Sequence, residues 1–277
     1  MVRNTGDREV FIQAGGIFKG GKQDRVLTVS MVVPPQSGDI PVGAFCVEQD
    51  CWEGRGSEKE REFSASMARL PSKAGRIALY YRSHRGSDVG AGGSEWTRTG
   101  RRLPAGDDLQ GRVWASVAET QSALSGAVRQ SVADERSRSS LQLSLENEAI
   151  RSALEGYEKA LGKLADEHPD VVGYVFAVAG NINNGDEFSS ASLSRKLWTK
   201  QLRAVATEAL TSEGATARAQ PTLAQVAAFI DGVGSAQASS RSMPGRMTVE
   251  TRPSGVAFYT EMRRSEGLRM HRSFIAR

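Results

Sequence analysis

The chain has 277 residues, of which 39% are hydrophobic and 25% are charged. A chain of this length and composition can bury a sizeable core, so we expect a soluble globular protein rather than a disordered one. The formal net charge of +4 is modest and does not by itself indicate a nucleic-acid-binding protein. No run in the sequence approaches the roughly 20 apolar residues that span a bilayer, so we expect no membrane-spanning helix.

The N-terminus and the cysteines bear on the compartment. Residues 1–9 lack the apolar core of a signal peptide, which predicts a cytoplasmic protein, or a secreted one if a leader has been removed. With only Cys46 and Cys51, no disulfide framework is expected, and two reduced thiols are favoured over a strained local disulfide. The three scattered histidines lack metal-ligand spacing, so we predict no metal, and the sequence identifies no cofactor.

Residues 9–48 predict a small antiparallel meander. The β-branched run 26–33 is typical of a buried strand, which Pro34-Pro35 ends. Residues 40–47 form another apolar run, in which Pro41 favours an edge or the start of a strand.

The next part of the chain divides into a loop-rich and a helical region. The polar composition of about 53–106 predicts a loop-rich insertion, although the short run 77–81 is compatible with a strand or a helix. In about 107–166, apolar residues recur on two stripes at helical spacing, which predicts two helices joined by the polar stretch 133–140. We expect these stripes to face the core, and a contact with a partner protein is the alternative.

The C-terminal part predicts strands around two further helices. Residues 171–178 predict a strand, and the asparagine-rich residues 181–186 predict a turn after it. Ser189 or Ser190 can cap the helix that follows. The remaining predicted elements are a helix to about Leu210, a helix over 223–231, a linker over 235–246, and strands over 247–250, 255–262 and 269–275.

This order of elements indicates an α+β fold, with helices packed on one side of a largely antiparallel sheet. No shift in composition marks a boundary, so we predict a single domain over residues 1–277. The glycine motifs of P-loop and dinucleotide-binding proteins are absent, and no catalytic motif of defined chemistry is present. The sequence therefore does not decide between an enzyme and a binding protein.

The densest group of unusual polar residues lies in two N-terminal segments. Lys22 and Arg25 follow a glycine pair, and together they can present cations and backbone amides to an anion. A tight turn with a solvated lysine is the alternative. Glu48 comes at the end of a predicted strand, where it is our candidate for an acid, a base or a ligand acceptor. It can equally form a structural ion pair with Arg25 or Lys22.

Four further residues complete the candidate ligand site. Gln23 and Gln49 can read polar groups of a ligand, and Trp52 can stack on a base, although a core tryptophan is the more common case. Asp186, with its asparagine neighbours, forms a second polar cluster at a strand–helix junction. A plain turn explains that cluster equally well.

The C-terminal residues 241–277 contain eight arginines and three glutamates. A basic face there could contact nucleic-acid phosphates, which is our third and weakest hypothesis. Arginines that are solvated or paired with glutamates are the favoured alternative, since no stacking aromatics are interleaved among them. His271 stands among these arginines, and we expect it at the surface.

Two specific motifs and several supporting ones span most of the chain. The two specific motifs are Gly21-Lys22-Gln23-Asp24-Arg25 and Cys46-Val47-Glu48-Gln49 followed by Trp52. The supporting motifs are Pro41-Val42, Val113-Trp114, Asp186 with Phe188, Lys196-Leu197-Trp198, and His271 with Phe274. With these motifs the chain resembles a bacterial family of domains associated with ADP-ribosylglycohydrolases and rhodanese-like phosphatases. Asp50 and Cys51 stand where that family usually has Gly-Arg, so any role of that arginine is unfilled here.

The resemblance implies an ADP-ribose or NAD-related setting, but it implies no reaction. Our first hypothesis is a site for an anionic nucleotide-like ligand, in which Lys22 and Arg25 hold phosphate, Glu48 and Gln49 read polar groups, and Trp52 stacks. The second is a non-catalytic structural or protein-interaction module, such as a homo-oligomer.

Overall fold

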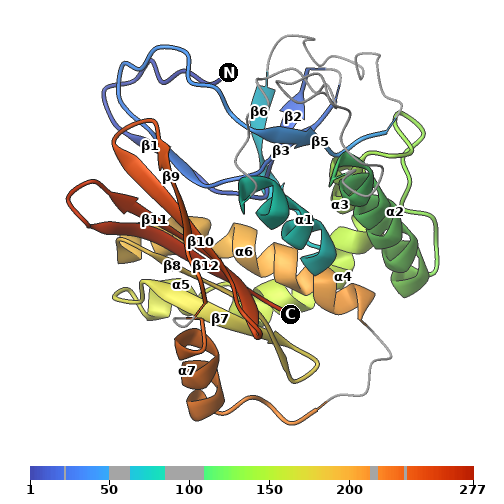
Figure 1. The fold of residues 1–277 in the computed structure, drawn as a ribbon. Coiled ribbons are helices and arrows are strands. Elements are labelled where there is room, and N and C mark those ends of the chain that lie inside the picture. Colours follow the sequence, from blue (N-terminus) through green and yellow to red (C-terminus); the bar gives the residue numbers. More distant parts are fainter. Residues whose placement is uncertain (22, 50–62, 85–108, 213–217, 234–235) are drawn as a thin grey trace.

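A computed structural model describes the chain except for residues 22, 50–62, 85–108, 213–217 and 234–235. The described residues form three antiparallel sheets with helices between and around them (Figure 1). This confirms the α+β prediction and the largely antiparallel pairing. The single domain over 1–277 stays a prediction. Among the described residues, no helix has the length and apolarity that a bilayer crossing requires.

The largest sheet has six strands in the order β7-β8-β12-β11-β10-β9. Its strands are β7 (Gly173–Val178), β8 (Asn181–Phe188), β9 (Ser239–Met243), β10 (Met247–Pro253), β11 (Ala257–Arg264) and β12 (Arg269–Ala276). The C-terminal strand β12 lies beside β8 from the middle of the chain, with His271 opposite Phe188 and Ser273 opposite Asp186. This pairing brings two polar residues that are far apart in sequence, Asp186 and His271, onto neighbouring strands.

Two smaller sheets come from the N-terminal third. β5 (Ala44–Cys46), β3 (Arg25–Leu27), β2 (Gly16–Gly20) and β6 (Phe63–Arg69) form a four-stranded sheet in that order, and β1 (Val10–Ile12) pairs with β4 (Met31–Val33). The predicted strand 26–33 is therefore two strands in two sheets. Thr28 and Ser30 occupy the break, where the Thr28 hydroxyl donates to the Gly43 carbonyl (3.2 Å) and the Ser30 hydroxyl accepts from the Ala14 N–H (3.0 Å). Such side chain–backbone bonds compete with strand pairing.

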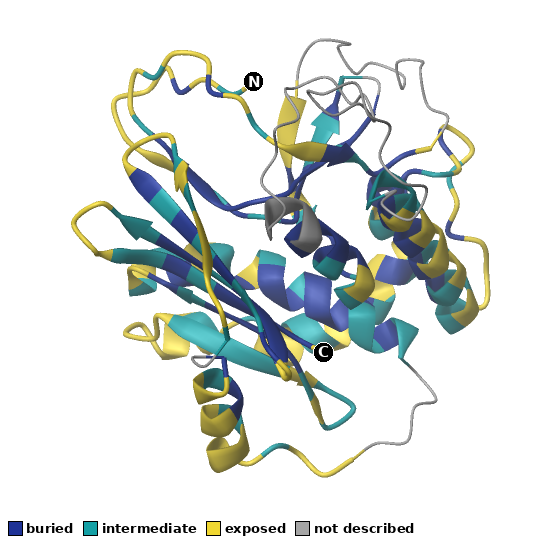
Figure 2. Ribbon diagram, in the orientation of Figure 1, coloured by how far each residue is buried: buried dark blue, intermediate teal, exposed yellow. Residues whose placement is uncertain are grey.

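Seven helices complete the described part of the fold. They are α1 (Lys73–His84), α2 (Leu109–Val128), α3 (Leu141–Glu146), α4 (Glu148–Leu161), α5 (Leu164–Glu167), α6 (Ala191–Thr211) and α7 (Leu223–Asp231). The long helix α6 crosses the middle of the molecule (Figure 1). Many of its residues are buried, among them Trp198, Gln201 and Leu202 (Figure 2). α7 packs on the opposite face of the large sheet, where Phe229 contacts the cluster of Tyr259 and Phe274, so the predicted packing of helices on one side does not extend to α7.

Several local predictions are confirmed. Ser190 caps α6 by accepting from the Leu193 N–H (3.2 Å), and the helix predicted over 223–231 is α7. The structure adds that Thr222 caps α7 in a reciprocal capping box with Gln225. The two apolar stripes predicted over 107–166 are core residues rather than a free partner surface. Buried members of these stripes are Val113, Val117, Leu124, Ile150 and Leu154.

Other local predictions are wrong. Residues 181–186 are not a turn: they lie in β8, and the reversal occurs earlier, at Ala179 (φ 48°) and Gly180 (φ 76°). Gly185 serves close strand packing instead, since an added Cβ would lie 2.8 Å from the Tyr174 carbonyl oxygen. The predicted linker 235–246 contains β9. Within 53–106, the described residues form the regular elements β6 and α1.

Candidate functional site

Glu48, the candidate catalytic residue, is fully buried and engaged by the protein itself. One carboxylate oxygen accepts from the Asp24 backbone N–H (2.7 Å), and the other accepts from the Ser137 hydroxyl (3.0 Å). Glu48 thus ties the turn between β2 and β3 to the segment before α3. These contacts are those of a structural carboxylate that closes loops.

The other described members of the N-terminal cluster also form hydrogen bonds with one another or with nearby residues. Arg25 donates to the Gln23 side chain (2.9 Å) and contacts the Cys46 sulfur, and the Gln49 backbone bonds the Ser139 hydroxyl. Burial raises the pKa of the Cys46 thiol, which disfavours the thiolate form that a nucleophile requires. Lys22 and Trp52 lie outside the described residues. The ligand site predicted at this cluster stays a prediction.

Asp186 belongs to a different and deeper centre. It is 1% exposed and accepts hydrogen bonds from Arg69 Nη1 (3.1 Å), His271 Nε2 (2.9 Å) and Gln13 Nε2 (3.2 Å). Gln201 on α6 bonds both Arg69 and Gln13, so the donors are themselves held. Residues from β6, β8, β12, α6 and the segment before β2 therefore converge on one carboxylate.

The electrostatics of Asp186 favour its ionised form. Burial opposes ionisation, but the charge of Arg69 and the hydrogen bond from His271 outweigh it and lower the pKa of Asp186 to about 2. Our expectation that His271 lies at the surface is wrong, because it is 2% exposed and packs against this carboxylate. Successive side chains of a strand point to opposite faces of the sheet, so His271 in β12 points inward whereas the neighbouring Arg272 points outward.

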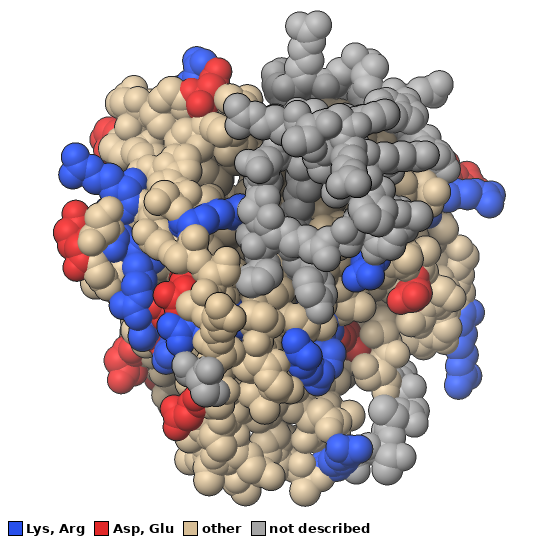
Figure 3. Space-filling view, in the orientation of Figure 1, with Lys and Arg blue, Asp and Glu red and all other residues tan. Residues whose placement is uncertain are grey.

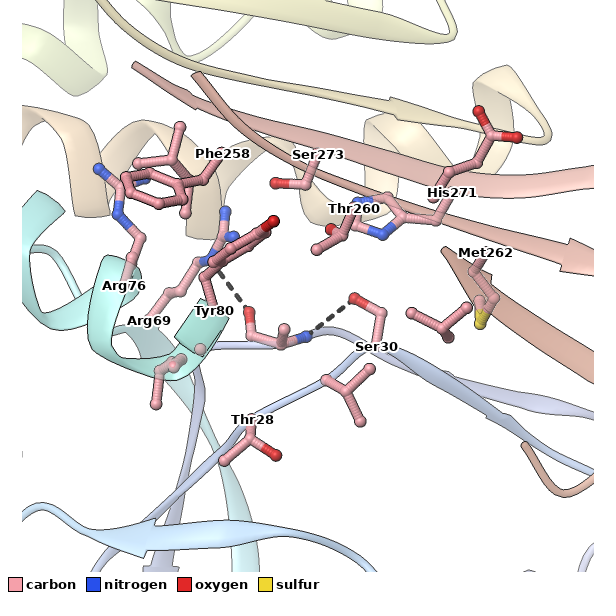
Figure 4. Close-up of a pocket in the computed structure, with 17 residues that line it drawn as sticks. Thr28, Ser30, Arg69, Arg76, Tyr80, Phe258, Thr260, Met262, His271 and Ser273 are labelled. Carbon is pink, nitrogen blue, oxygen red and sulfur yellow. Dashed lines mark hydrogen bonds between the residues drawn. The ribbon is translucent and has the colours of Figure 1, made fainter. Parts of the chain in front are cut away.

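A cavity of about 40 Å³ lies against this centre, between the large sheet and the N-terminal elements, and it is not fully enclosed. We call it the inter-sheet cavity. Figure 4 shows that the break after β3 carries Thr28 and Ser30 on one side, and that β11 and β12 carry Thr260, His271 and Ser273 on another. Its labelled lining residues are Thr28, Ser30, Arg69, Arg76, Tyr80, Phe258, Thr260, Met262, His271 and Ser273.

Arg76 on α1 is the most unusual residue of this lining. It is 2% exposed, and its Nη2 donates to Asn183 (3.0 Å) and to Glu208 (2.8 Å). Its Nε and Nη1 are buried and have no hydrogen-bond partner among the described residues. Burial lowers the pKa of Arg76, which reflects how poorly its charge is solvated. Buried donors without acceptors are costly, so this guanidinium is suited to an additional acceptor.

The sequence did not single out Arg69 or Arg76. Both fall in the region 53–106 that its polar composition predicted as loop-rich, yet Arg69 ends strand β6 and Arg76 lies in the first turn of α1. The alternation in 63–69 and the apolar run 77–81 were the available signals for these elements. Neither signal says that the two arginines meet. Among the described residues, no group of three or more metal-ligating side chains is clustered.

The C-terminal arginines are largely neutralised. Five of the eight form ion pairs with glutamates: Arg252 with Glu250, Arg263 with Glu261, Arg264 with Glu9, and both Arg269 and Arg272 with Glu187. Figure 3 shows positive and negative side chains interspersed on the visible face of the described residues. Paired arginines, the alternative to a basic nucleic-acid face, therefore describe most of this segment.

Comparison with known proteins identifies a family. The family model described as the ARG and Rhodanese-Phosphatase-superfamily-associated Protein domain, ARPP-1, matches residues 1–274. No curated protein and no solved structure matches the chain. Because the match spans nearly the whole chain, the resemblance drawn from the two N-terminal motifs is confirmed, and the protein belongs to the ARPP-1 domain family.

Proposed function

We propose that the protein binds the phosphate end of an anionic, nucleotide-like ligand in the inter-sheet cavity. The observation that carries this proposal is Arg76, a buried cation whose Nε and Nη1 lack acceptors among the described residues. Phosphate oxygens are strong acceptors, and the planar guanidinium matches them in geometry. A phosphate there would satisfy donors that the described protein groups leave unused.

The surroundings of Arg76 support an acceptor-rich and partly polar ligand. Asn184, which is 1% exposed, has no hydrogen-bond partner for either side-chain atom among the described residues, and it follows the Asn183 that Arg76 contacts. Asn184 is not itself among the lining residues of the inter-sheet cavity, whereas Ser30, Thr260 and Ser273, which carry hydroxyls, are. A volume of about 40 Å³ accommodates roughly three water molecules or one small tetrahedral anion, and not a whole nucleotide.

The family name supports the ligand class. It records an association with ARG proteins, the ADP-ribosylglycohydrolases, and with the rhodanese–phosphatase superfamily. ADP-ribose and NAD contain phosphate groups, the kind of acceptor that the buried guanidinium of Arg76 would bind. Association is an indirect argument, so the ligand has to be identified by measurement.

The N-terminal cluster of Lys22, Gln23, Arg25, Glu48, Gln49 and Trp52 is the other place where such a ligand could bind. Its described side chains already bond one another or nearby backbone, so fewer donors are left for a ligand. A non-catalytic interaction module, for instance a homo-oligomer, is the alternative function. The experiment below separates these possibilities.

The test compares two matched arginine variants, Arg76→Lys and Arg25→Lys. Binding of inorganic phosphate, ADP-ribose and NAD is measured by calorimetry and by the shift in melting temperature. Ligand at about 100 times its dissociation constant should stabilise the wild type by roughly 2.7 kcal/mol. We expect Arg76→Lys to weaken binding about 10- to 100-fold, because hydrogen bonds to charged groups contribute roughly 1.5–3 kcal/mol each.

Arg25→Lys should bind as the wild type does, and both variants should keep the wild-type circular dichroism. Weakened binding in Arg25→Lys alone would move the site to the N-terminal cluster. Absence of binding by the wild type for all three ligands would contradict the proposal and favour the interaction module.

A further inference from the structure

We propose that His271 is a general base oriented by Asp186, and that the protein hydrolyses a phosphate monoester whose phosphate occupies the inter-sheet cavity. This inference rests on the proposed function, since it requires the phosphate to bind there. It adds a reaction and a catalytic residue to what was a binding site. Four features of His271 carry it.

The first feature is the tautomer of the imidazole. Asp186 is ionised and can only accept hydrogen bonds, so the proton in its 2.9 Å contact with His271 must come from Nε2. The neutral ring then has an unprotonated Nδ1, which is the nitrogen that can take up a proton. A carboxylate that fixes a histidine tautomer in this way is the arrangement used by catalytic acid–base histidines.

The second feature is that the ring is held in place before any ligand arrives. Phe188 stacks on the imidazole with ring centres 5.0 Å apart and planes at 20°, and Phe11 meets it edge-on at 5.5 Å. Asp186 is in turn held by Arg69 and Gln13. Preorganised groups of this kind need little rearrangement to reach a reactive geometry.

The third feature is the direction of the ring. His271, Ser273 and Thr260 line the inter-sheet cavity, and Figure 4 shows the His271 ring close to Thr260 on the cavity side of the sheet. Among the described residues, Asp186 is the one hydrogen-bond partner of the His271 side chain. Nδ1 is therefore available to a water or a ligand in the cavity, and neighbouring hydroxyls can help to orient that water.

The fourth feature is what faces His271. Arg69 and Arg76 contribute to the lining from β6 and α1, while His271 comes from β12. A phosphate near Arg76 would be stabilised as negative charge builds up on its oxygens. Among the described lining residues, Ala14 and Thr260 are partly exposed and the others are buried, and the cavity is not fully enclosed.

The reaction uses water as its co-reactant. Nδ1 of His271 takes a proton from a water molecule as the water oxygen forms a bond to phosphorus. The bond between phosphorus and the ester oxygen breaks on the opposite side, where the departing oxygen takes a proton from solvent water, and His271 returns its own proton to solvent. The products are an alcohol and inorganic phosphate, and the histidine returns to its neutral state. General acid–base catalysis of this kind typically contributes about 10²–10⁴-fold.

The test measures release of inorganic phosphate from p-nitrophenyl phosphate and from adenosine monophosphate, with wild type, His271→Gln and His168→Gln. Glutamine can still donate to Asp186 through its amide, but it cannot accept a proton, so folding and phosphate binding should persist. We expect turnover to fall at least about 100-fold in His271→Gln. His168, which is exposed at the end of α5, provides the matched control and should leave turnover unchanged.

Four results would overturn the inference. Phosphate binding without hydrolysis by the wild type would refute the catalytic role and leave the proposed function standing. Full turnover by His271→Gln would refute the role of this residue. A nitrogen-15 spectrum of the His271 ring in the wild type does not depend on whether the variant folds. A neutral ring that is protonated on Nδ1 would also refute the role of His271. Absence of phosphate binding would remove both proposals.

Discussion

A buried carboxylate is tolerated at position 186 because three donors converge on it. Arg69, His271 and Gln13 replace the water that Asp186 loses on folding, and the charge of Arg69 offsets the cost of burial. The same contacts make the residue sensitive to change. Removal of the charge leaves Arg69 buried without its counter-ion.

We predict that Asp186→Asn lowers the free energy of unfolding by roughly 3–5 kcal/mol at neutral pH, as expected when one member of a buried ion pair is removed. Urea unfolding followed by circular dichroism measures this. Asp39→Asn is the matched control, since its ion pair with Arg3 is exposed and its loss should leave stability nearly unchanged. Equal effects in both variants would contradict the assignment of Asp186 as a buried anchor.

The same prediction has a pH dependence. Because the pKa of Asp186 is lowered from 3.8 to about 2 in the folded protein, its contribution is complete above pH 4. It is lost as the pH falls through the folded-state value and amounts to about 2 kcal/mol. The wild type should lose this stability between about pH 4 and pH 2, whereas Asp186→Asn should lose less in that window.

Strand β8 depends on a close approach that a glycine permits. Gly185 lies between β7 and β12, where an added Cβ would meet the Tyr174 carbonyl oxygen at 2.8 Å and the Val175 side chain at 2.9 Å. The asparagine–glycine pair that suggests a turn in the sequence therefore serves sheet packing. Asp186, the residue after Gly185 in β8, is thereby held in the interior of the protein.

We predict opposite effects for two glycine-to-alanine changes. Gly185→Ala should destabilise the protein by about 1–3 kcal/mol, because the strands must move apart to admit the methyl group. Gly126→Ala in α2 should stabilise it by roughly 0.5–1 kcal/mol, since nothing lies within 4 Å of its Cβ and alanine favours a helix. Thermal and urea unfolding measure both. A neutral Gly185→Ala would show that the sheet relaxes freely there.

At the scale of the whole molecule, charge is distributed in pairs rather than in a field of one sign. Five arginines of the C-terminal segment face glutamates, and two of those glutamates, Glu187 and Glu261, each serve two arginines. Neutralised arginines release few counter-ions on contact with a polyanion. This distribution disfavours a nucleic-acid surface.

We therefore predict that the protein does not bind duplex DNA or single-stranded RNA at about 150 mM salt and micromolar protein, where non-specific binders retain dissociation constants of roughly 10⁻⁴–10⁻⁶ M. Fluorescence anisotropy over a salt series measures this. Binding that weakens steeply with salt would contradict the prediction. Triple replacement of Glu187, Glu250 and Glu261 by glutamine provides a positive comparison, since it frees the paired arginines.

The sequence by itself determined the α+β class, most helices and the closing strands. Apolar periodicity and a helix cap such as Ser190 are local signals that act within a few residues. It also carried the family, through motifs at 21–25 and 46–52. Local signals failed at 26–33 and 181–186, where pairing partners from distant parts of the chain decided the structure.

Only the tertiary structure decided which polar residues form the candidate site. Glu48 and Asp186 look alike in sequence as polar residues near strand ends. The fold buries Glu48 against the Asp24 backbone N–H and the Ser137 hydroxyl, whereas it gives Asp186 an arginine and a histidine. The inter-sheet cavity joins side chains of β6, α1 and β12. Their meeting depends on which strands become neighbours, and strand order is a property of the whole core that no local pattern encodes.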